Sequence, residues 1–328
     1  MTKYLVIYLE DKLAEIEDLF INPEKTKAGC SFGDIPIPIS YTQSQYVVLG
    51  IPIDLTTTFG KTTARGPESI RTTSAKQIET LIFEKNLEIF EKALIYDIGD
   101  LKIDNSISCE DLDLKLVREF WTTFDSQISK VMGYIDETNK VPIILGGEHT
   151  ITYSLFKHIS KDDPILLHFD AHRDMKPVYD GMEMCHTTPF YHLIDSGILD
   201  GNDLVQIGVR QADRNENDYA KNNGVVTFDA WYCKNSFDAV KNWINKITQN
   251  RQVYISFDID VYDISYLPCT GTPEPFGLDP FQISDLLNNI NSSASLIGVD
   301  LVETGFKNCD YREGALATQT LLRILTSL

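Results

Sequence analysis

The segment HFDAHRD, residues 168–174, carries three side chains that can bind a metal ion. Asp170, His172 and Asp174 occupy alternate positions directly after the apolar run PILL. In an extended backbone, residues at alternate positions point to the same side. A solvated loop would explain a single aspartate or histidine here. Three such residues so close together predict a binding site whose other ligands lie elsewhere in the chain.

Further carboxylate and imidazole groups follow other apolar runs. After VPIILGG, QVYISF and SLIGVDLV come, in turn, Glu148 and His149, Asp258 and Asp260, and Glu303. Together with the first segment, two imidazoles and four aspartates form a hard-to-borderline donor set, which suits Mn²⁺ or another divalent first-row ion. Six ligands are too many for one ion that must also hold a water. They predict two ions, about 3.5–4 Å apart and bridged by carboxylates.

Each of these residues also has a structural explanation. His149 could begin a helix, since EHTITYSLF opens a helical pattern. Asp258 and Asp260 could solvate a loop or cap a helix. We interpret His158 as a structural or surface residue, and His168, inside the strand, as a core histidine or one that supports a metal ligand. Their joint occurrence at the ends of four strands favours the metal site.

Alternating apolar runs and amphipathic stretches predict the elements that position these residues. Two helices are indicated by apolar residues at spacings of three and four: Val117, Trp121, Phe124, Ile128 and Val131, and Phe237, Val240, Trp243 and Ile247. Most of the remaining runs are continuously apolar, which is typical of strands covered on both faces: 46–53, 93–99, 141–147, 164–170, 203–209, 225–230, 252–260 and 295–303. We therefore expect an α/β fold in three layers, α/β/α, with an open, mostly parallel, eight-stranded sheet rather than a barrel. Ligands bind at the carboxyl ends of such strands.

Composition narrows the possible functions. The chain has 328 residues and a formal net charge of −19, which argues against a nucleic-acid partner, because binding polyphosphate needs clustered cations. An acidic protein suits a cationic substrate, although salt adaptation also acidifies a surface. We find no apolar stretch that could span a membrane and no signal peptide, so we expect a cytoplasmic protein. The six cysteines form no CxxC motif, which disfavours a zinc ribbon or a dithiol redox site.

The segments GGEHT, DAHRD, SFDID and TGTPEP, followed by Glu303, stand in the order and nearly the spacing of a known family. From residue 46 to the C-terminus, the sequence resembles the ureohydrolases: arginases, agmatinases and relatives that release urea from guanidino compounds. The resemblance implies an arginase-like fold, with a single catalytic domain at residues 46–328. Residues 1–45, with one short helix and a Pro-containing loop, are interpreted from their pattern as an N-terminal extension. The resemblance also implies a homo-oligomer, trimeric or hexameric.

The resemblance further implies two Mn²⁺ ions, although Ni²⁺ or Co²⁺ could occupy the same ligands. One ion would be held by His149, Asp170, Asp174 and Asp258. The other would be held by Asp170, His172, Asp258 and Asp260. Asp170 and Asp258 would then bridge the two ions.

The resemblance also assigns catalytic and pocket residues. His186 in CHTTPF matches the family's catalytic histidine, a proton shuttle near the leaving group. Glu303 matches the acid that grips the guanidinium through paired hydrogen bonds, and Thr272 matches a residue of the same pocket. Two divalent ions lower the pKa of a shared water and supply hydroxide at neutral pH. Asp260 could relay a proton to the departing nitrogen.

Several features resemble the agmatinase branch and predict agmatine as the substrate, cleaved to putrescine and urea. They are Glu148 where arginases usually have Asp, the EP of TGTPEPFG, and the stretches QIGVRQADRNENDYA and DMKPVYDGMEMCHTT. Asp213 matches the arginase residue that recognises the α-amino group; it could meet the distal ammonium of agmatine or cap the following turn. Lys176 stands where arginases have Asn and could pair with a substrate carboxylate. Arginine, guanidinobutyrate, guanidinopropionate and guanidine stay open as alternative substrates.

Three other classes share some of these features. A binuclear phosphoesterase would need phosphate-cradling glycine loops or clustered Arg and Lys, whereas the loops here are acidic or neutral apart from Arg173 and Lys176. A zinc deacetylase would need one ion and would leave the full ligand set unexplained. A non-catalytic homologue would typically have lost ligands, and none is missing here.

Overall fold

The computed structural model describes residues 12–34, 39–103, 113–159 and 163–327. Of the expected N-terminal extension, residues 1–11 and 35–38 lie outside the described residues. The division into an extension and one catalytic domain stays a prediction. Within the described ranges, no helix is both long enough and apolar enough to cross a lipid bilayer.

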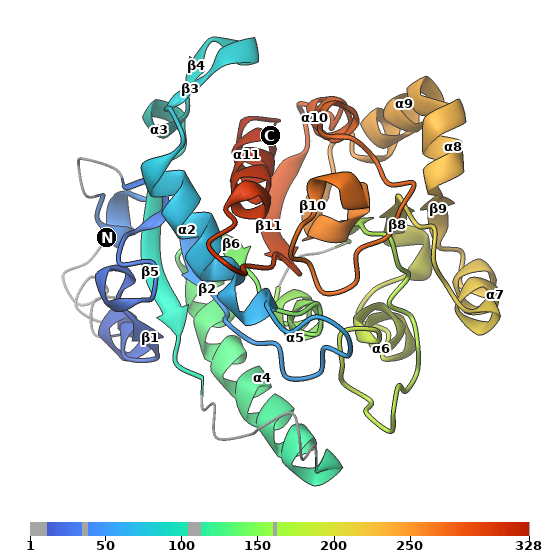
Figure 1. Ribbon diagram of the computed structural model, residues 1–328, viewed down its shortest axis with the longest axis horizontal. Helices are drawn as coiled ribbons and strands as arrows, with labels where there is room; N and C mark the ends of the chain where they lie inside the picture. Colours follow the sequence, from blue (N-terminus) through green and yellow to red (C-terminus); the bar gives the residue numbers. More distant parts are fainter. Residues whose placement is uncertain (1–11, 35–38, 104–112, 160–162, 328) are drawn as a thin grey trace.

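A nine-stranded sheet forms the middle layer, in the order β1-β5-β2-β6-β11-β10-β7-β8-β9 (Figure 1). Its strands are β1 (Phe20–Ile21), β2 (Tyr46–Gly50), β5 (Ile95–Leu101), β6 (Val141–Leu145), β7 (Ile165–Phe169), β8 (Leu204–Ile207), β9 (Val226–Phe228), β10 (Gln252–Asp258) and β11 (Ser295–Val302). β2 and β5–β11 are parallel and coincide with the eight predicted strands, so the predicted sheet is confirmed. β1 is an additional edge strand, antiparallel to β5, which the sequence did not indicate because its two residues carry no period. β3 (Leu81–Ile82) and β4 (Leu87–Glu88) form a separate antiparallel pair.

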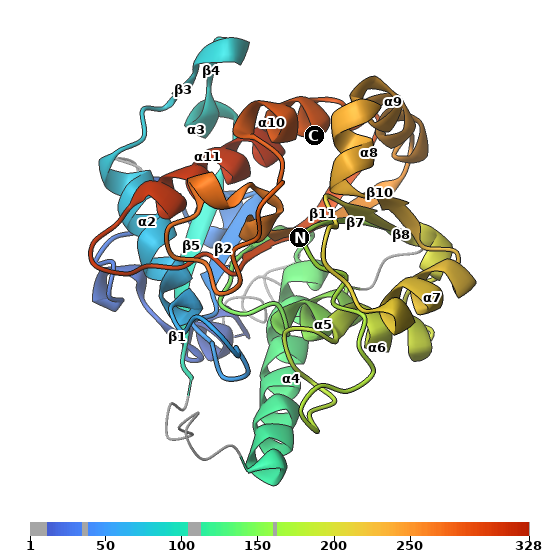
Figure 2. The same cartoon turned by 45° about the vertical axis from the view of Figure 1, so that its right-hand side comes forward.

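Helices cover both faces of the sheet, giving the three expected layers (Figures 1 and 2). One face carries α2 (Gly66–Lys76), α8 (Ala230–Asn235), α9 (Phe237–Ile247), α10 (Pro280–Asn288) and α11 (Arg312–Ser327). The other carries α4 (Leu114–Glu137), α5 (Ile151–Lys157), α6 (Pro189–Asp195) and α7 (Arg214–Asn222). A short helix, α3 (Ile89–Lys92), links the small hairpin to β5.

Successive residues of the central strands alternate between the two cores. In β10, Val253 and Ile255 pack under α9, α10 and α11, whereas Tyr254 packs on the opposite side with Phe156 of α5. Because every residue of such a strand meets a core, the strand must be apolar throughout. This burial explains the continuous apolar runs of the sequence.

The two amphipathic helices predicted from periodicity are confirmed. In α4, the five apolar residues from Val117 to Val131 are all buried. In α9, Val240 is fully buried, and Phe237, Trp243 and Ile247 pack against the same core while partly exposed. Spacings of three and four place such residues on one helical face, which is the face turned to the sheet.

A buried ion-pair network joins α2 to β5. The guanidinium of Arg71, fully buried, donates to both oxygens of Asp97 at 2.8 and 2.9 Å, to Asp100, and to the carbonyl of Gly99 at 3.0 Å. Removing one partner of a buried pair leaves uncompensated charge, which is more costly than the pair was worth.

Arg71→Met should therefore lower the free energy of unfolding by about 3–5 kcal/mol. Arg118→Met is a matched control, because Arg118 forms a 3.5 Å pair with Glu183 in which both side chains are more than half exposed; it should cost less than about 1 kcal/mol. Urea denaturation measures both. Equal losses would contradict the role given to the buried network.

Candidate metal centre

The ends of four adjacent strands bring the predicted ligands together. β6, β11, β10 and β7 are neighbours in the sheet and run parallel, so their carboxyl ends meet at one edge. His149 follows β6, Glu303 follows β11, Asp258 ends β10 and Asp170 follows β7. Gly147 allows this approach, because a Cβ there would lie 1.9 Å from the carbonyl oxygen of Ile53.

The first group of ligands consists of His149, Asp170, Asp174 and Asp258, all buried. The Nδ1 atom of His149 lies 3.1 Å from Asp170 Oδ2, 3.0 Å from Asp174 Oδ2 and 3.3 Å from Asp258 Oδ2. None of these contacts has hydrogen-bond geometry, so this buried nitrogen has no hydrogen-bond partner. The four side chains predicted for one ion therefore surround a common point.

The other ring nitrogen fixes how His149 presents Nδ1. Ser256 Oγ donates its only proton to Asp300 Oδ1 at 2.8 Å, and so accepts from His149 Nε2–H at 3.0 Å. Tyr254 OH also donates to Asp300, at 2.6 Å. With one proton fixed on Nε2, the ring turns Nδ1 toward three carboxylates, which outweigh burial and raise the pKa of His149 well above its usual range. Nδ1 therefore faces anions that a cation, either a proton or a metal ion, must pair, and in metal sites a supporting hydrogen bond orients the ligating imidazole in this way.

The second group consists of Asp170, His172 and Asp260. His172 Nδ1 lies 3.0 Å from Asp260 Oδ2 and 3.4 Å from Asp170 Oδ1. Asp170 belongs to both groups, as expected for a bridging ligand. Asp258 belongs only to the first, and its Oδ1 accepts from the backbone N–H of Asp260 at 2.8 Å.

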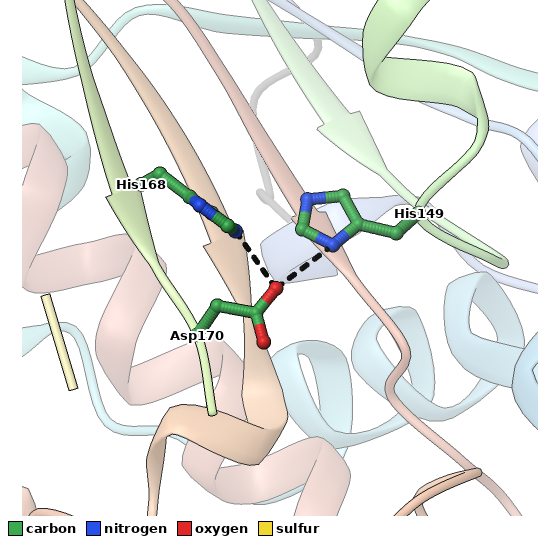
Figure 3. A group of neighbouring side chains, drawn as sticks. All are labelled: His149, His168 and Asp170. Carbon is green, nitrogen blue, oxygen red and sulfur yellow. Dashed lines mark hydrogen bonds and ion pairs between the residues drawn. The ribbon is translucent and has the colours of Figure 1, made fainter. Parts of the chain in front are cut away.

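His168 supports the metal ligand Asp170 through a hydrogen bond. Figure 3 shows His149 and His168 directed at the same oxygen of Asp170, with His168 Nε2 2.7 Å from Oδ2. The opposite nitrogen of His168 lies 3.1 Å from Gln206 Nε2, and its ring packs on Phe190 at 3.9 Å. Burial lowers the pKa of His168 to about 4. The neutral ring can therefore donate to Asp170, which agrees with a supporting role.

Two of the aspartates, Asp258 and Asp174, are too crowded to be stable as anions alone. Burial, with the charges of Asp260 and Asp170, raises the pKa of Asp258 well above its usual range. Burial and Asp170 raise the pKa of Asp174 to about 7. Divalent cations would remove this penalty, since buried charges are stable when paired or coordinated. The residues present thus fit two metal ions.

Two residues of the site have strained backbones. Asp174 has φ 51° and Glu303 has φ 58°, in the left-handed region that L-residues seldom adopt. Such strain persists where the surroundings over-determine the backbone, and it clusters at functional sites. At Glu303, the carboxylate accepts from the backbone N–H of His149 at 2.8 Å, and the backbone N–H donates to the carbonyl of Gly147 at 2.8 Å. These two hydrogen bonds therefore hold the carboxylate beside the ligands despite the strain.

A cleft of about 440 Å³ opens onto both groups, and His186, Thr272, Glu274 and Glu303 line it. Burial, followed by the charges of His172 and His149, lowers the pKa of His186 to about 4, so its ring is neutral at pH 7. Cys185, the preceding residue, is fully buried, and burial raises the pKa of its thiol to about 11. A larger groove of about 890 Å³, between α10 and α11, lies apart from these ligands.

The model of the Arginase family matches residues 44–324. The chain belongs to the arginase family. A mitochondrial agmatinase of Gallus gallus is 30% identical over 279 residues, 84% of this chain and 78% of that protein. A mitochondrial guanidino acid hydrolase of Homo sapiens is 30% identical over 283 residues, 84% of this chain and 75% of that protein. The crystal structure of the agmatine ureohydrolase of Thermoplasma volcanium has a TM-score of 0.76 and 26% identity, covering 96% of this chain and 97% of that one.

Membership of the arginase family makes the protein a guanidino hydrolase and sets aside the phosphoesterase and deacetylase alternatives. In this protein, one cleft brings together the predicted metal ligands and the residues His186, Thr272 and Glu303. Thr272 Oγ1 donates to Asp260 Oδ2 at 3.4 Å. His158 lies elsewhere, 3.1 Å from Asp125, as expected of a structural residue.

Lys176 and Asp213 line the same cleft but bind each other. The ammonium of Lys176 pairs with Asp213 and lies 3.3 Å from Glu216 Oε2. Asp213 also precedes the first residue of α7, and its backbone N–H donates to Glu216 Oε2 at 2.9 Å, as in a capping box. Both interpretations of Asp213, a cap and a cleft residue, are therefore compatible with its position.

Three further residues that support the cleft were not predicted from the sequence. Glu216 and Glu274 line it, and Thr56 contacts His186 from a loop 130 residues away in the sequence. The spacing of Asp213 and Glu216 is a capping-box signal that could have indicated Glu216. No local pattern marks Thr56, because its role depends on a tertiary contact.

Ser256→Ala should weaken binding of Mn²⁺ to the metal-free protein by about 10–100-fold, because the supporting hydrogen bond orients His149. Isothermal titration calorimetry measures this affinity. Ser44→Ala is the control: Ser44 is equally buried, but its hydroxyl donates to the carbonyl of Tyr41, away from the ligands. Unchanged affinity in Ser256→Ala would refute the orienting role.

Proposed function

We propose that the protein hydrolyses the guanidinium group of a substrate with a second positive charge, agmatine in the first place, to urea and an amine. The ion pairs of Lys176 with Asp213 and Glu216 carry this proposal. Because of these pairs, the Lys176 ammonium is not free to bind a carboxylate of the substrate. One lysine between two carboxylates also leaves a net negative charge on this wall of the cleft.

Arg173, the other Lys or Arg side chain that lines the cleft, is also engaged in hydrogen bonds. The guanidinium of Arg173 donates to Asn217 at 2.6 Å, Gln206 at 2.7 Å and Thr227 at 3.0 Å. Glu274 adds another carboxylate to the lining. An ammonium tail would therefore find a complementary field in the cleft, whereas a carboxylate tail would meet like charges.

The guanidinium itself would bind at Glu303. Burial and the charge of Glu148 raise the pKa of Glu303 well above its usual range, so the carboxylate is stabilised by a bound cation. A planar guanidinium matches a carboxylate through two parallel hydrogen bonds. The carbonyl of Glu303 accepts from Thr270 Oγ1 at 2.9 Å, which helps to hold this residue, and Thr272 lines the same cleft.

The proposed chemistry uses water as the nucleophile. Two divalent ions bound by the aspartates and histidines would activate a water between them. Asp260 Oδ1 accepts from the backbone N–H of Ala171 at 3.0 Å, and its Oδ2 accepts from Thr272 at 3.4 Å and lies 3.0 Å from His172 Nδ1. These contacts fix the carboxylate where it could both bind an ion and relay a proton. His186, neutral at pH 7, can pass a proton between the departing nitrogen and solvent.

Mn²⁺ is the proposed ion. Two imidazoles and four carboxylates favour a borderline-to-hard divalent ion over thiolate-loving metals. Ni²⁺ and Co²⁺ suit the same donors, and we propose Mn²⁺ as the ion that the protein uses. The expected homo-oligomer, trimer or hexamer, and the cytoplasmic location also stay predictions.

A guanidino acid is the second candidate substrate. The human guanidino acid hydrolase is as similar to this chain as the chicken agmatinase, at 30% identity. Lys176 would anchor the acid if its pair with Asp213, a side chain 70% exposed, opened to admit a carboxylate. That exchange would have to break two ion pairs to form one.

The substrate proposal is tested by urea release from Mn²⁺-loaded protein with agmatine, arginine, guanidinobutyrate, guanidinopropionate and guanidine. Agmatine should give the highest kcat/KM. Asp170→Asn is the control, because it removes the shared ligand. Preference for a carboxylate-bearing substrate would overturn the proposed charge selection while leaving the reaction class intact.

Lys176→Met tests the charge argument directly. Removing the ammonium leaves two uncompensated carboxylates, so KM for agmatine should fall about two- to five-fold while KM for guanidinobutyrate rises. Lys221→Met, on exposed α7 surface outside the cleft lining, makes the same charge change and should alter neither. A loss of agmatine affinity in Lys176→Met would contradict the argument.

A further inference from the structure

The side chain of His186 is held by a residue outside its own loop. Thr56, 1% exposed, lies in the segment that follows β2. Its hydroxyl oxygen lies 3.1 Å from the backbone nitrogen of His186 and 3.4 Å from its Nδ1. On another side the ring meets Tyr179 edge-on, with centroids 6.2 Å apart.

The proton of the Thr56 hydroxyl has a definite acceptor. Glu148 Oε1 accepts from Thr56 Oγ1 and from Thr150 Oγ1, each at 2.6 Å, and Glu148 Oε2 accepts from Thr56 N–H at 2.6 Å. Burial raises the pKa of Glu148, and these three bonds oppose the rise. Three donors converging on one carboxyl group fit its ionised form. The hydroxyl therefore donates to Glu148 and can only accept from other groups.

We propose that Thr56 is a positioning residue for His186: it accepts a hydrogen bond from Nδ1–H and so leaves Nε2, across the ring, as the unprotonated nitrogen. The backbone of His186 is fixed by the same residue, because His186 N–H also donates to Thr56 Oγ1. Glu148, Thr56 and His186 thus form a directed chain from a buried carboxylate to the cleft. This inference rests on the proposed role of His186 in proton transfer.

The tautomer matters because a neutral imidazole carries one proton. A shuttle must accept a proton at one nitrogen without first rotating or exchanging the other. With Nδ1–H bound to Thr56, Nε2 is ready to accept. Loss of the hydroxyl would free the ring to rotate and to populate the opposite tautomer, which lowers turnover more than substrate binding.

The test measures kcat, KM and bound Mn²⁺ for Thr56→Val and Thr56→Ser, each with and without His186→Ala. Thr56→Val keeps the shape and removes the acceptor, so kcat should fall about 10–100-fold with KM nearly unchanged. Thr56→Ser restores the acceptor and should recover most of the activity. With His186→Ala already present, Thr56→Val should have no further effect on kcat.

Thr57→Val is the matched control, because the Thr57 hydroxyl lies one residue away and donates to the carbonyl of Asp54. Its kcat should stay within about two-fold of the original. If Thr56→Val folds poorly, Thr56→Ala and ¹⁵N-histidine spectra of the tautomer provide the same comparison.

The outcomes distinguish a failure of the role proposed for His186 from a failure of the role proposed for Thr56. Full activity of His186→Ala would overturn the proposed role of His186 itself. If His186→Ala is impaired but Thr56→Val costs the same factor with and without His186, Thr56 acts elsewhere and the inference is wrong. Unchanged kcat in Thr56→Val, or no recovery by Thr56→Ser, would also overturn it.

Discussion

The arrangement of this protein depends on the negative charge buried at one edge of its sheet. Asp170, Asp174, Asp258 and Asp260 each have less than a tenth of their surface exposed, and they lie within reach of one another. Such a cluster is stable only with cations. The position of His149 Nδ1 among the carboxylates, and the supporting bonds of Ser256 and His168, meet that requirement.

Much of this centre could be predicted from the sequence because strands and ligands share simple periods. A parallel strand buried on both faces is apolar until it ends, so the first polar residues mark its carboxyl end. The two-residue spacing of Asp170, His172 and Asp174 then indicates a common direction. Eight strands were predicted correctly because they are apolar runs of several residues, whereas the two-residue β1 is too short to form such a run.

Contacts between distant segments could not be predicted in this way. Lys176 and Asp213 were expected as substrate ligands, each by itself, and their mutual ion pair appears only when the loops after β7 and β8 meet. Thr56 and His186 are a similar case, separated by 130 residues. Local patterns specify what a side chain can do, but tertiary packing decides which partner reaches it first.

The burial of Cys185 has a consequence for how the protein withstands oxidation. Because burial raises the pKa of this thiol to about 11, almost none of it is ionised at pH 7. Peroxides and alkylating agents react with thiolates, so they would largely bypass this position despite its place next to His186. The chain therefore keeps a polarizable sulfur in the wall behind the cleft without making the site sensitive to the redox state of its surroundings.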